Sequence, residues 1–294
     1  MKPSEISALL QARGFIFKKS LGQNFLLDPN LLRAVADAGD VGPGDLVIEV
    51  GTGAGTLTTV LADRAAEVVT VELDQRIAEI SREVIGDRAN VRHVAGDAIK
   101  GEHGLHPEIE AALASAAARG LTAKCVSNFP YNIATPLFLH LLERSVVDRA
   151  FPLALIAGTV QREVAERLTA TEISKAYGVP SVLTQALAGV RIDRRIGPAA
   201  FFPRPKIESA VVRLDPRPEA NLAIRDYGQF RALVRAVFQY RRKTVKNAVE
   251  RGLCLDGAAV EKALAELGIE PRSRVEALSL TTLAHLANAL NGVP

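Results

Sequence analysis

Apolar and polar positions follow two different periods along the first two hundred residues. Short, continuous apolar runs rich in valine and isoleucine predict buried strands. Between them, apolar residues three or four positions apart predict amphipathic helices. The expected strands are 45–50, 67–73, 91–97, 123–128 and 152–160. The expected helices are 56–65, 75–85, 107–118, 136–142 and 161–168, preceded by helices at 1–14 and 29–39. Strands that alternate with helices predict a parallel sheet covered on both faces.

The pattern changes after the fifth strand and its helix. Segments 189–196 and 209–216 read as two strands joined by a proline-rich loop, which predicts an antiparallel pair at a sheet edge. Beyond Pro216 only helical patterns separated by glycines remain. We therefore predict two domains. Residues 1–216 form an α/β domain with a mostly parallel, seven-stranded Rossmann-like sheet, and residues 217–294 form a small helical domain.

A glycine-rich turn follows the first strand in the stretch VIEVGTGAGTLT. Gly51, Gly53 and Gly55 permit positive φ angles and a close approach of a ligand to the backbone. Thr56 stands where a GxGxxG dinucleotide loop would have a third glycine, so binding of a pyrophosphate is not favoured.

Polar residues end the next three strands. Glu72 can accept hydrogen bonds from ribose hydroxyls, and Asp97 can accept from an adenine amino group. A single acid at a strand end is more often only solvated. Because ligands of open α/β sheets lie across the carboxyl ends of the strands, we expect both acids to converge with Asn128. S-adenosylmethionine fits such a site, because it has a ribose and an adenine but no phosphate, and its positive sulfur suits an acid-rich pocket that includes Glu49.

The stretch SNFPYNIATP, residues 127–136, follows the fourth strand. Asparagine and proline would also serve in a plain turn. Here Asn128 offers a side-chain carbonyl and Pro130 a main-chain carbonyl, which can accept the two protons of an exocyclic amine. Tyr131 offers a ring on which a flipped base can stack. This set favours methyl transfer to an adenine amine by positioning and oriented dipoles.

Together with KKSLGQNFLLD, QREVAERL, SKAYG and FFPRPKIESAVVRL, these stretches resemble the ribosomal RNA adenine dimethyltransferase family. The resemblance is strongest to its bacterial members, which dimethylate two adjacent adenosines near the 3′ end of small-subunit (16S) rRNA. It implies a class I methyltransferase fold, S-adenosylmethionine as the cofactor, and the assembling small subunit as the partner. Alternatives of the same fold are a large-subunit rRNA methyltransferase of the macrolide-resistance type and a non-catalytic assembly factor.

The resemblance also implies roles for individual residues. The segment 1–28 would close over the cofactor, with Asn24 and Leu26 at its methionine end. Ala98, beside Asp97, would contact the adenine of the cofactor. Phe201 would form the second face of a base sandwich with Tyr131.

Three positions depart from the family pattern. Phe129 stands where leucine is usual, and its ring could narrow the pocket. Ser127 replaces a glycine or alanine, and the pair Val179–Pro180 replaces leucine and serine after the SKAYG stretch.

The formal net charge is only +3, so the charge of the whole chain says little about its partners. Local clusters of cations are more informative. Phosphate contacts position a nucleic acid rather than read its sequence, and clustered cations suit them. A solvated helix face would carry the same charges. The candidate RNA-binding residues are Lys18 and Lys19, Arg204 and Lys206 on the proline loop, and Arg241, Arg242, Lys243 and Lys246 on an expected basic helix, 230–252.

Several classes of protein are disfavoured. Cys125 and Cys254 are far apart, which argues against disulfides and for a reducing compartment. We see no signal peptide and no membrane span, and expect a cytoplasmic protein. His103 and His106 have no cysteine nearby, so no metal site is expected. Nothing in the sequence demands more than a monomer.

Overall fold

The computed structural model describes residues 3–17, 22–101, 104–217 and 224–291. The chain divides into two compact units: residues 1–165 with 189–216, and residues 166–188 with 217–294. The expected boundary near residue 216 coincides with the end of the first unit. The sequence prediction places residues 166–188 in the α/β domain, whereas in the structure they fall in the second unit, where α8 (Val179–Leu187) packs on α9 and α12.

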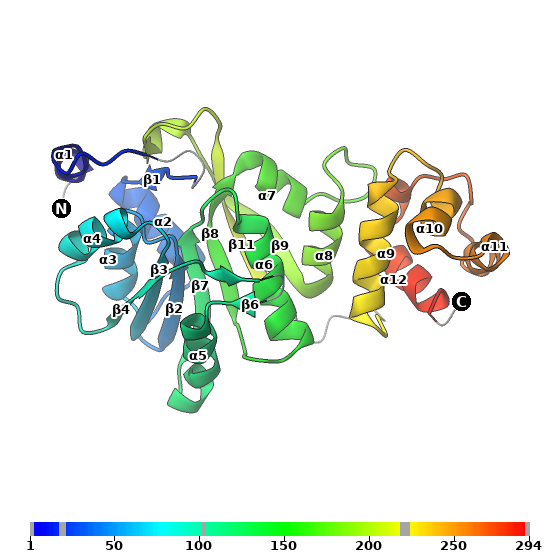
Figure 1. Cartoon of the computed structure of the whole chain (residues 1–294), viewed down its shortest axis with the longest axis horizontal. Coiled ribbons are helices and arrows are strands. Elements are labelled where there is room, and N and C mark those ends of the chain that lie inside the picture. Colours follow the sequence, from blue (N-terminus) through cyan, green and yellow to red (C-terminus); the bar gives the residue numbers. More distant parts are fainter. Residues whose placement is uncertain (1–2, 18–21, 102–103, 218–223, 292–294) are drawn as a thin grey trace. The chain divides into compact units, whose positions relative to one another are not determined.

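The first unit is built on a seven-stranded sheet (Figure 1). From one edge to the other its strands are β4 (Val91–Ala95), β3 (Glu67–Glu72), β2 (Asp45–Val50), β7 (Thr122–Asn128), β8 (Leu155–Gln161), β11 (Ser209–Pro216) and β9 (Ala188–Ile196). The first five run parallel, and β11 pairs antiparallel with β8. The predicted mostly parallel sheet with an antiparallel edge is confirmed.

Helices cover both faces of this sheet, with α2, α3 and α4 on one side and α5 and α6 on the other (Figure 1). Asp28 caps α2, since its carboxylate accepts the N–H groups of Asn30 and Leu31 at 2.8 and 3.1 Å. The helices are α1 (Pro3–Ala12), α2 (Pro29–Ala38), α3 (Thr56–Ala62), α4 (Gln75–Ile85), α5 (Pro107–Ala116), α6 (Ala134–Leu142) and α7 (Arg162–Leu168).

Two short ladders lie outside the main sheet. β1 (Phe25–Leu26) pairs antiparallel with β10 (Phe201–Phe202), so the N-terminal segment is bonded to the proline-rich loop. β5 (Ile99–Lys100) pairs with β6 (Gly104–Leu105). Single turns of 3₁₀ or π helix occupy Ala117–Arg119, Glu143–Val147, Pro198–Ala200 and Val275–Ala277.

The second unit is helical and is organised around Tyr177. This buried residue of the SKAYG stretch donates its hydroxyl to the carbonyl of Leu278 at 3.2 Å, and its ring meets Phe238 edge-on at 5.7 Å. The pair Val179–Pro180 simply begins α8. The other helices are α9 (Tyr227–Gln239), α10 (Val245–Leu253), α11 (Gly257–Glu266) and α12 (Leu280–Ala289).

The expected continuous basic helix 230–252 is wrong. α9 ends at Gln239, and α10 begins anew after Thr244, whose hydroxyl accepts the N–H of Asn247. A Thr N-cap starts a helix more readily than it continues one, which explains the break. Within the part of the chain that the structure describes, no helix has the length and apolar character needed to cross a bilayer.

Candidate active site

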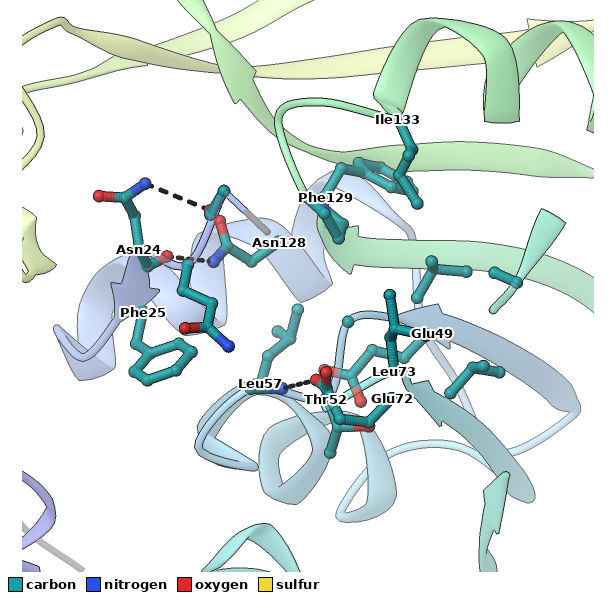
Figure 2. Close-up of a pocket in the computed structure, with 18 of the residues that line it drawn as sticks. Asn24, Phe25, Glu49, Thr52, Leu57, Glu72, Leu73, Asn128, Phe129 and Ile133 are labelled. Carbon is teal, nitrogen blue, oxygen red and sulfur yellow. Dashed lines mark hydrogen bonds between the residues drawn. The ribbon is translucent and has the colours of Figure 1, made fainter. Parts of the chain in front are cut away.

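A cavity opens where β2 and β7 separate near their carboxyl ends. Their ladder stops at the pair Ile48 and Cys125, and the N–H of Val50 instead donates to the Ser127 hydroxyl at 2.8 Å. The family departure at Ser127 therefore supplies a hydrogen bond that a glycine or alanine side chain lacks. Most predicted site residues line the cavity (Figure 2): Asn24, Leu26, Gly51, Gly53, Glu72, Asp97, Ala98, Asn128 and Pro130.

The glycine turn lets two other segments pack directly on it. Gly51 and Gly53 have φ angles of 85° and 54°. A Cβ atom at Gly51 would lie 2.9 Å from Pro130 Cγ, and one at Gly53 would lie 2.9 Å from Phe25 Cδ1. Gly55 does not line the cavity. A Cβ atom there would lie 2.9 Å from Ile85 Cγ1 of α4, so the missing side chain makes room for helix packing.

Glu72 is held at the end of β3 by the backbone. One carboxylate oxygen accepts the N–H of Gly53 at 2.9 Å (Figure 2). The other accepts the N–H of Asp74, also at 2.9 Å. Burial raises the pKa of Glu72 above its usual range. Each oxygen keeps a lone pair for a further donor, such as a hydroxyl group.

Leu73, the residue after Glu72, lines the cavity but was not predicted as a site residue. Leu73 is 51% exposed and lies on the cavity wall, where it offers an apolar surface to a planar ring. The sequence feature that could have indicated it is the position of this leucine between Glu72 and Asp74 at the end of a strand. Asp97 lies two residues beyond β4 and is exposed, with one oxygen accepting the N–H of Ile99 at 3.0 Å. Its other oxygen accepts no hydrogen bond from the residues that the structure describes.

Glu49 is a buried acid on the floor of the cavity. The hydroxyls of Thr58 and Thr70 both donate to its Oε2 atom, at 2.6 and 2.7 Å. Burial raises the pKa of Glu49 to about 8, against the ordinary 4.5. A cation in the cavity would favour the charged form of this carboxyl.

Asn128 joins the stretch 127–136, called the strand-four motif because it follows the fourth predicted strand (β7), to the N-terminal segment. Its Nδ2 atom donates to the main-chain carbonyl of Asn24 at 2.8 Å (Figure 2). Its Oδ1 atom accepts a hydrogen bond from the hydroxyl of Thr159 on β8. Asn24 in turn donates its side-chain amide to Gly22 at 3.2 Å. The expected closure of the N-terminal segment over the site thus has a physical link in the structure.

The aromatic residues lie differently from the expectation. Tyr131 does not line the cavity; its hydroxyl shares a hydrogen bond of 2.7 Å with Ser209. Phe201 is only 4% exposed and packs with Leu26 and Val211 in the core. The β1–β10 ladder, which sets Phe201 opposite Leu26, accounts for this burial. The Phe201 ring is therefore covered by core side chains rather than exposed to a base.

Phe129 does not simply narrow the pocket. It is 1% exposed and meets Phe138 edge-on, with ring centroids 4.7 Å apart. Space for the ring comes from Gly158 on β8, where a Cβ atom would lie 2.6 Å from Phe129 Cε2. The larger side chain is therefore accommodated mainly in the core.

The candidate RNA-binding residues fall into three groups. Lys18 and Lys19 lie outside the described residues. Arg241 donates to Glu276 at 2.7 Å and Lys246 to Glu261 at 2.9 Å, so both stabilise the helical unit. The remaining four candidates, Arg204, Lys206, Arg242 and Lys243, are exposed and have no ion pair to any described residue.

Comparison with known proteins identifies the family of the chain. The family described as "Ribosomal RNA adenine dimethylase" matches residues 14–292. Two curated relatives, each described as "Ribosomal RNA small subunit methyltransferase A", are 37% identical to this chain. The protein of Moorella thermoacetica is covered over 97% of its length and 98% of this chain, and that of Geobacillus kaustophilus over 96% and 98%.

Solved structures share the fold. A dimethyladenosine transferase from Plasmodium falciparum has a TM-score of 0.72 at 22% identity, over 90% of this chain and 98% of that one. The 23S rRNA methyltransferase ErmE has a TM-score of 0.62 at 24% identity, over 91% and 100%. With a family match that runs across both units, the chain belongs to the ribosomal RNA adenine dimethylase family, whose members use S-adenosylmethionine.

Proposed function

We propose that the protein dimethylates N6 of two adjacent adenosines near the 3′ end of small-subunit rRNA, in the cytoplasm, during assembly of the subunit. The observation that carries this proposal is the position of Asn128, at the exit of β7, on the same cavity as Glu72 and Asp97. The printed names of the curated relatives favour the small subunit over the large one.

The cavity suits S-adenosylmethionine, which supplies a methyl group on a positively charged sulfur. Glu72 has acceptor capacity left for the ribose hydroxyls, and Leu73 offers an apolar surface for the adenine ring. The free carboxylate oxygen of Asp97 would accept from the adenine amino group. Gly51 admits the cofactor close to the backbone, and Asn24 closes the methionine end.

Asn128 would hold the target amine rather than remove its proton. The cofactor would supply the methyl group: its carbon would leave sulfur, which keeps the electron pair, and bond to N6, and the amine would lose one proton to water in each transfer. The Asn128 carbonyl would accept an amine proton and direct the nitrogen lone pair toward the methyl group. The Pro130 carbonyl already accepts the N–H of Ile133 at 3.1 Å but has a second lone pair for the other proton.

The base would stack on Tyr131 alone. Hydrogen bonding to Ser209 fixes the phenol end of this side chain, so the position of its ring is set before RNA arrives. Phe201 supports the same region from within the core, through its ladder with Leu26.

Exposed cations would guide the RNA backbone. Arg204 and Lys206 belong to the first unit, and Arg242 and Lys243 to the turn between α9 and α10 of the second unit. We infer that the helical unit binds rRNA phosphates through the latter pair and that the enzyme acts as a monomer.

Methyl transfer to defined RNAs tests this function. The protein is incubated with labelled S-adenosylmethionine and either unmethylated small subunits or large-subunit rRNA, and the modified bases are mapped. We expect two adjacent N6,N6-dimethyladenosines in the small subunit only. Asn128→Ala should keep RNA affinity and lose most turnover, whereas Asn30→Ala, an exposed asparagine on α2, should behave as wild type. No transfer to either RNA would refute the enzymatic function.

A further inference from the structure

Thr159 on strand β8 contacts the stretch that follows β7 through both its side chain and its backbone. Thr159 lies opposite Asn128 in the parallel ladder of β7 and β8 and is fully buried. Its hydroxyl donates to Asn128 Oδ1, and its main-chain carbonyl accepts the N–H of Phe129 at 3.2 Å. A single residue on the neighbouring strand thus contacts two consecutive residues of the motif.

The two hydrogen bonds of the Asn128 side chain fix which way its amide points. Nδ2 needs an acceptor and finds the Asn24 carbonyl; Oδ1 needs a donor and finds the Thr159 hydroxyl. A rotation of the amide by half a turn would place Oδ1 against the carbonyl of Asn24, which cannot donate. It would also leave the proton of the buried Thr159 hydroxyl without its acceptor, which is costly.

Thr159 and Asn24 hold the Asn128 amide from different parts of the fold. Asn24 belongs to the N-terminal segment, whereas Thr159 lies in the central sheet. The bond from Thr159 therefore holds the amide without depending on the N-terminal segment. It occupies one lone pair of Oδ1 and leaves the second for an incoming donor.

We propose that Thr159 is a positioning residue for methyl transfer, which keeps the Asn128 carbonyl oxygen oriented to accept a proton of the target adenine amine. The proposal rests on the function proposed above and on the role given there to Asn128. It also concerns the second methyl transfer in particular. A monomethylated adenine amine has only one proton left, so a single hydrogen bond orients it. A misoriented Asn128 amide should therefore slow the second methyl transfer more than the first.

Thr159→Val tests the proposal, because it removes the hydroxyl and keeps the shape of the side chain. Loss of one such hydrogen bond should lower kcat about five- to tenfold. KM for both substrates should stay within about twofold, and N6-monomethyladenosine should accumulate. Thr159→Ser should recover turnover. A matched control is Thr184→Val, since the Thr184 hydroxyl is also buried but has no hydrogen-bond partner among the described residues.

A double-mutant cycle separates positioning from a general effect on the fold. If Thr159 acts through Asn128, then Thr159→Val should change the residual single-turnover rate of Asn128→Ala by less than about twofold. Melting temperatures are measured for every variant. Should Thr159→Val not fold, Thr159→Cys tests the same contact, because a thiol is a weaker donor and should give the same kind of loss.

The results that overturn the proposal are distinct from those that overturn the function. With an active wild type, the proposal fails if Thr159→Val keeps its kcat and its product ratio. It also fails if Thr159→Ser does not recover turnover, if Thr184→Val loses as much, or if Thr159→Val slows Asn128→Ala by its full factor. An inactive wild type would instead remove the proposed function itself.

Discussion

Glu49 should make the ligand-free protein less stable as the pH rises through neutrality. The side chain is 1% exposed, and burial raises its pKa to about 8 from the ordinary 4.5. Between these two values the folded protein keeps a proton that the unfolded chain has lost. The free energy of unfolding therefore falls with rising pH, by about 1.4 kcal/mol per pH unit, and by roughly 5 kcal/mol across the whole interval.

Glu49→Gln isolates this contribution. Its amide oxygen can still accept from the hydroxyls of Thr58 and Thr70, but the side chain cannot ionise. Relative to the variant, the wild type should lose roughly 2–3 kcal/mol of stability between about pH 6 and pH 8. Urea unfolding followed by far-ultraviolet circular dichroism measures both curves, and hydrogen exchange of the β2 amides reports on the first unit separately.

The same carboxyl should couple cofactor binding to proton release. Since the cationic cofactor favours ionised Glu49, the affinity for S-adenosylmethionine should rise with pH up to about 8. Calorimetry at pH 7 in two buffers of different ionisation enthalpy should detect a released proton for the wild type, and less for Glu49→Gln. If the wild type and Glu49→Gln show parallel stability curves and release the same number of protons, Glu49 is already ionised in the folded protein. That result would refute this reasoning.

Three further changes have defined outcomes. Gly158→Ala would bring a Cβ atom to 1.9 Å from the Ser127 carbonyl oxygen, so it should cost about 1–3 kcal/mol or more in a urea titration. Ser127→Ala leaves the buried N–H of Val50 without its acceptor and should cost about 1–3 kcal/mol, read in the same titration; an unchanged midpoint would contradict this. Replacing both Arg242 and Lys243 by alanine should reduce the slope of log affinity for rRNA against log salt by roughly one to two, measured at several potassium chloride concentrations.

The fold could be predicted wherever its cause is local. Continuous apolar runs are buried strands because both faces of the parallel sheet are covered, and amphipathic helices follow from the spacing of their apolar residues. The assignment of residues 166–188 failed because its cause is distant. Tyr177 is buried through Leu278 and Phe238, which lie far along the chain, and this contact draws α8 into the second unit.

The site was predictable to the extent that parallel topology determines it. Glu72 and Asn128 are the last residues of β3 and β7, which lie on either side of β2. Their convergence therefore follows from strand order. The direction of a side chain does not follow in this way. Gly55 faces Ile85, and Phe201 faces the core, because of packing that no local pattern records. Leu73 was missed because an exposed leucine is ordinary in any protein.

Phe129 shows why a departure from a family pattern cannot be interpreted alone. A larger residue in the motif suggests a narrower pocket, but Ser127 and Gly158 are opposite each other in the β7–β8 ladder, and the absent side chain of Gly158 admits the ring. Phe129 then packs on Phe138 beneath the residue that we propose to hold the target amine. Because Gly158 precedes Thr159, the same two residues of β8 make room for the ring and orient the amide of Asn128. Phe129 therefore packs behind the site, and the space that Gly158 of β8 leaves, rather than contact with the base, explains its size.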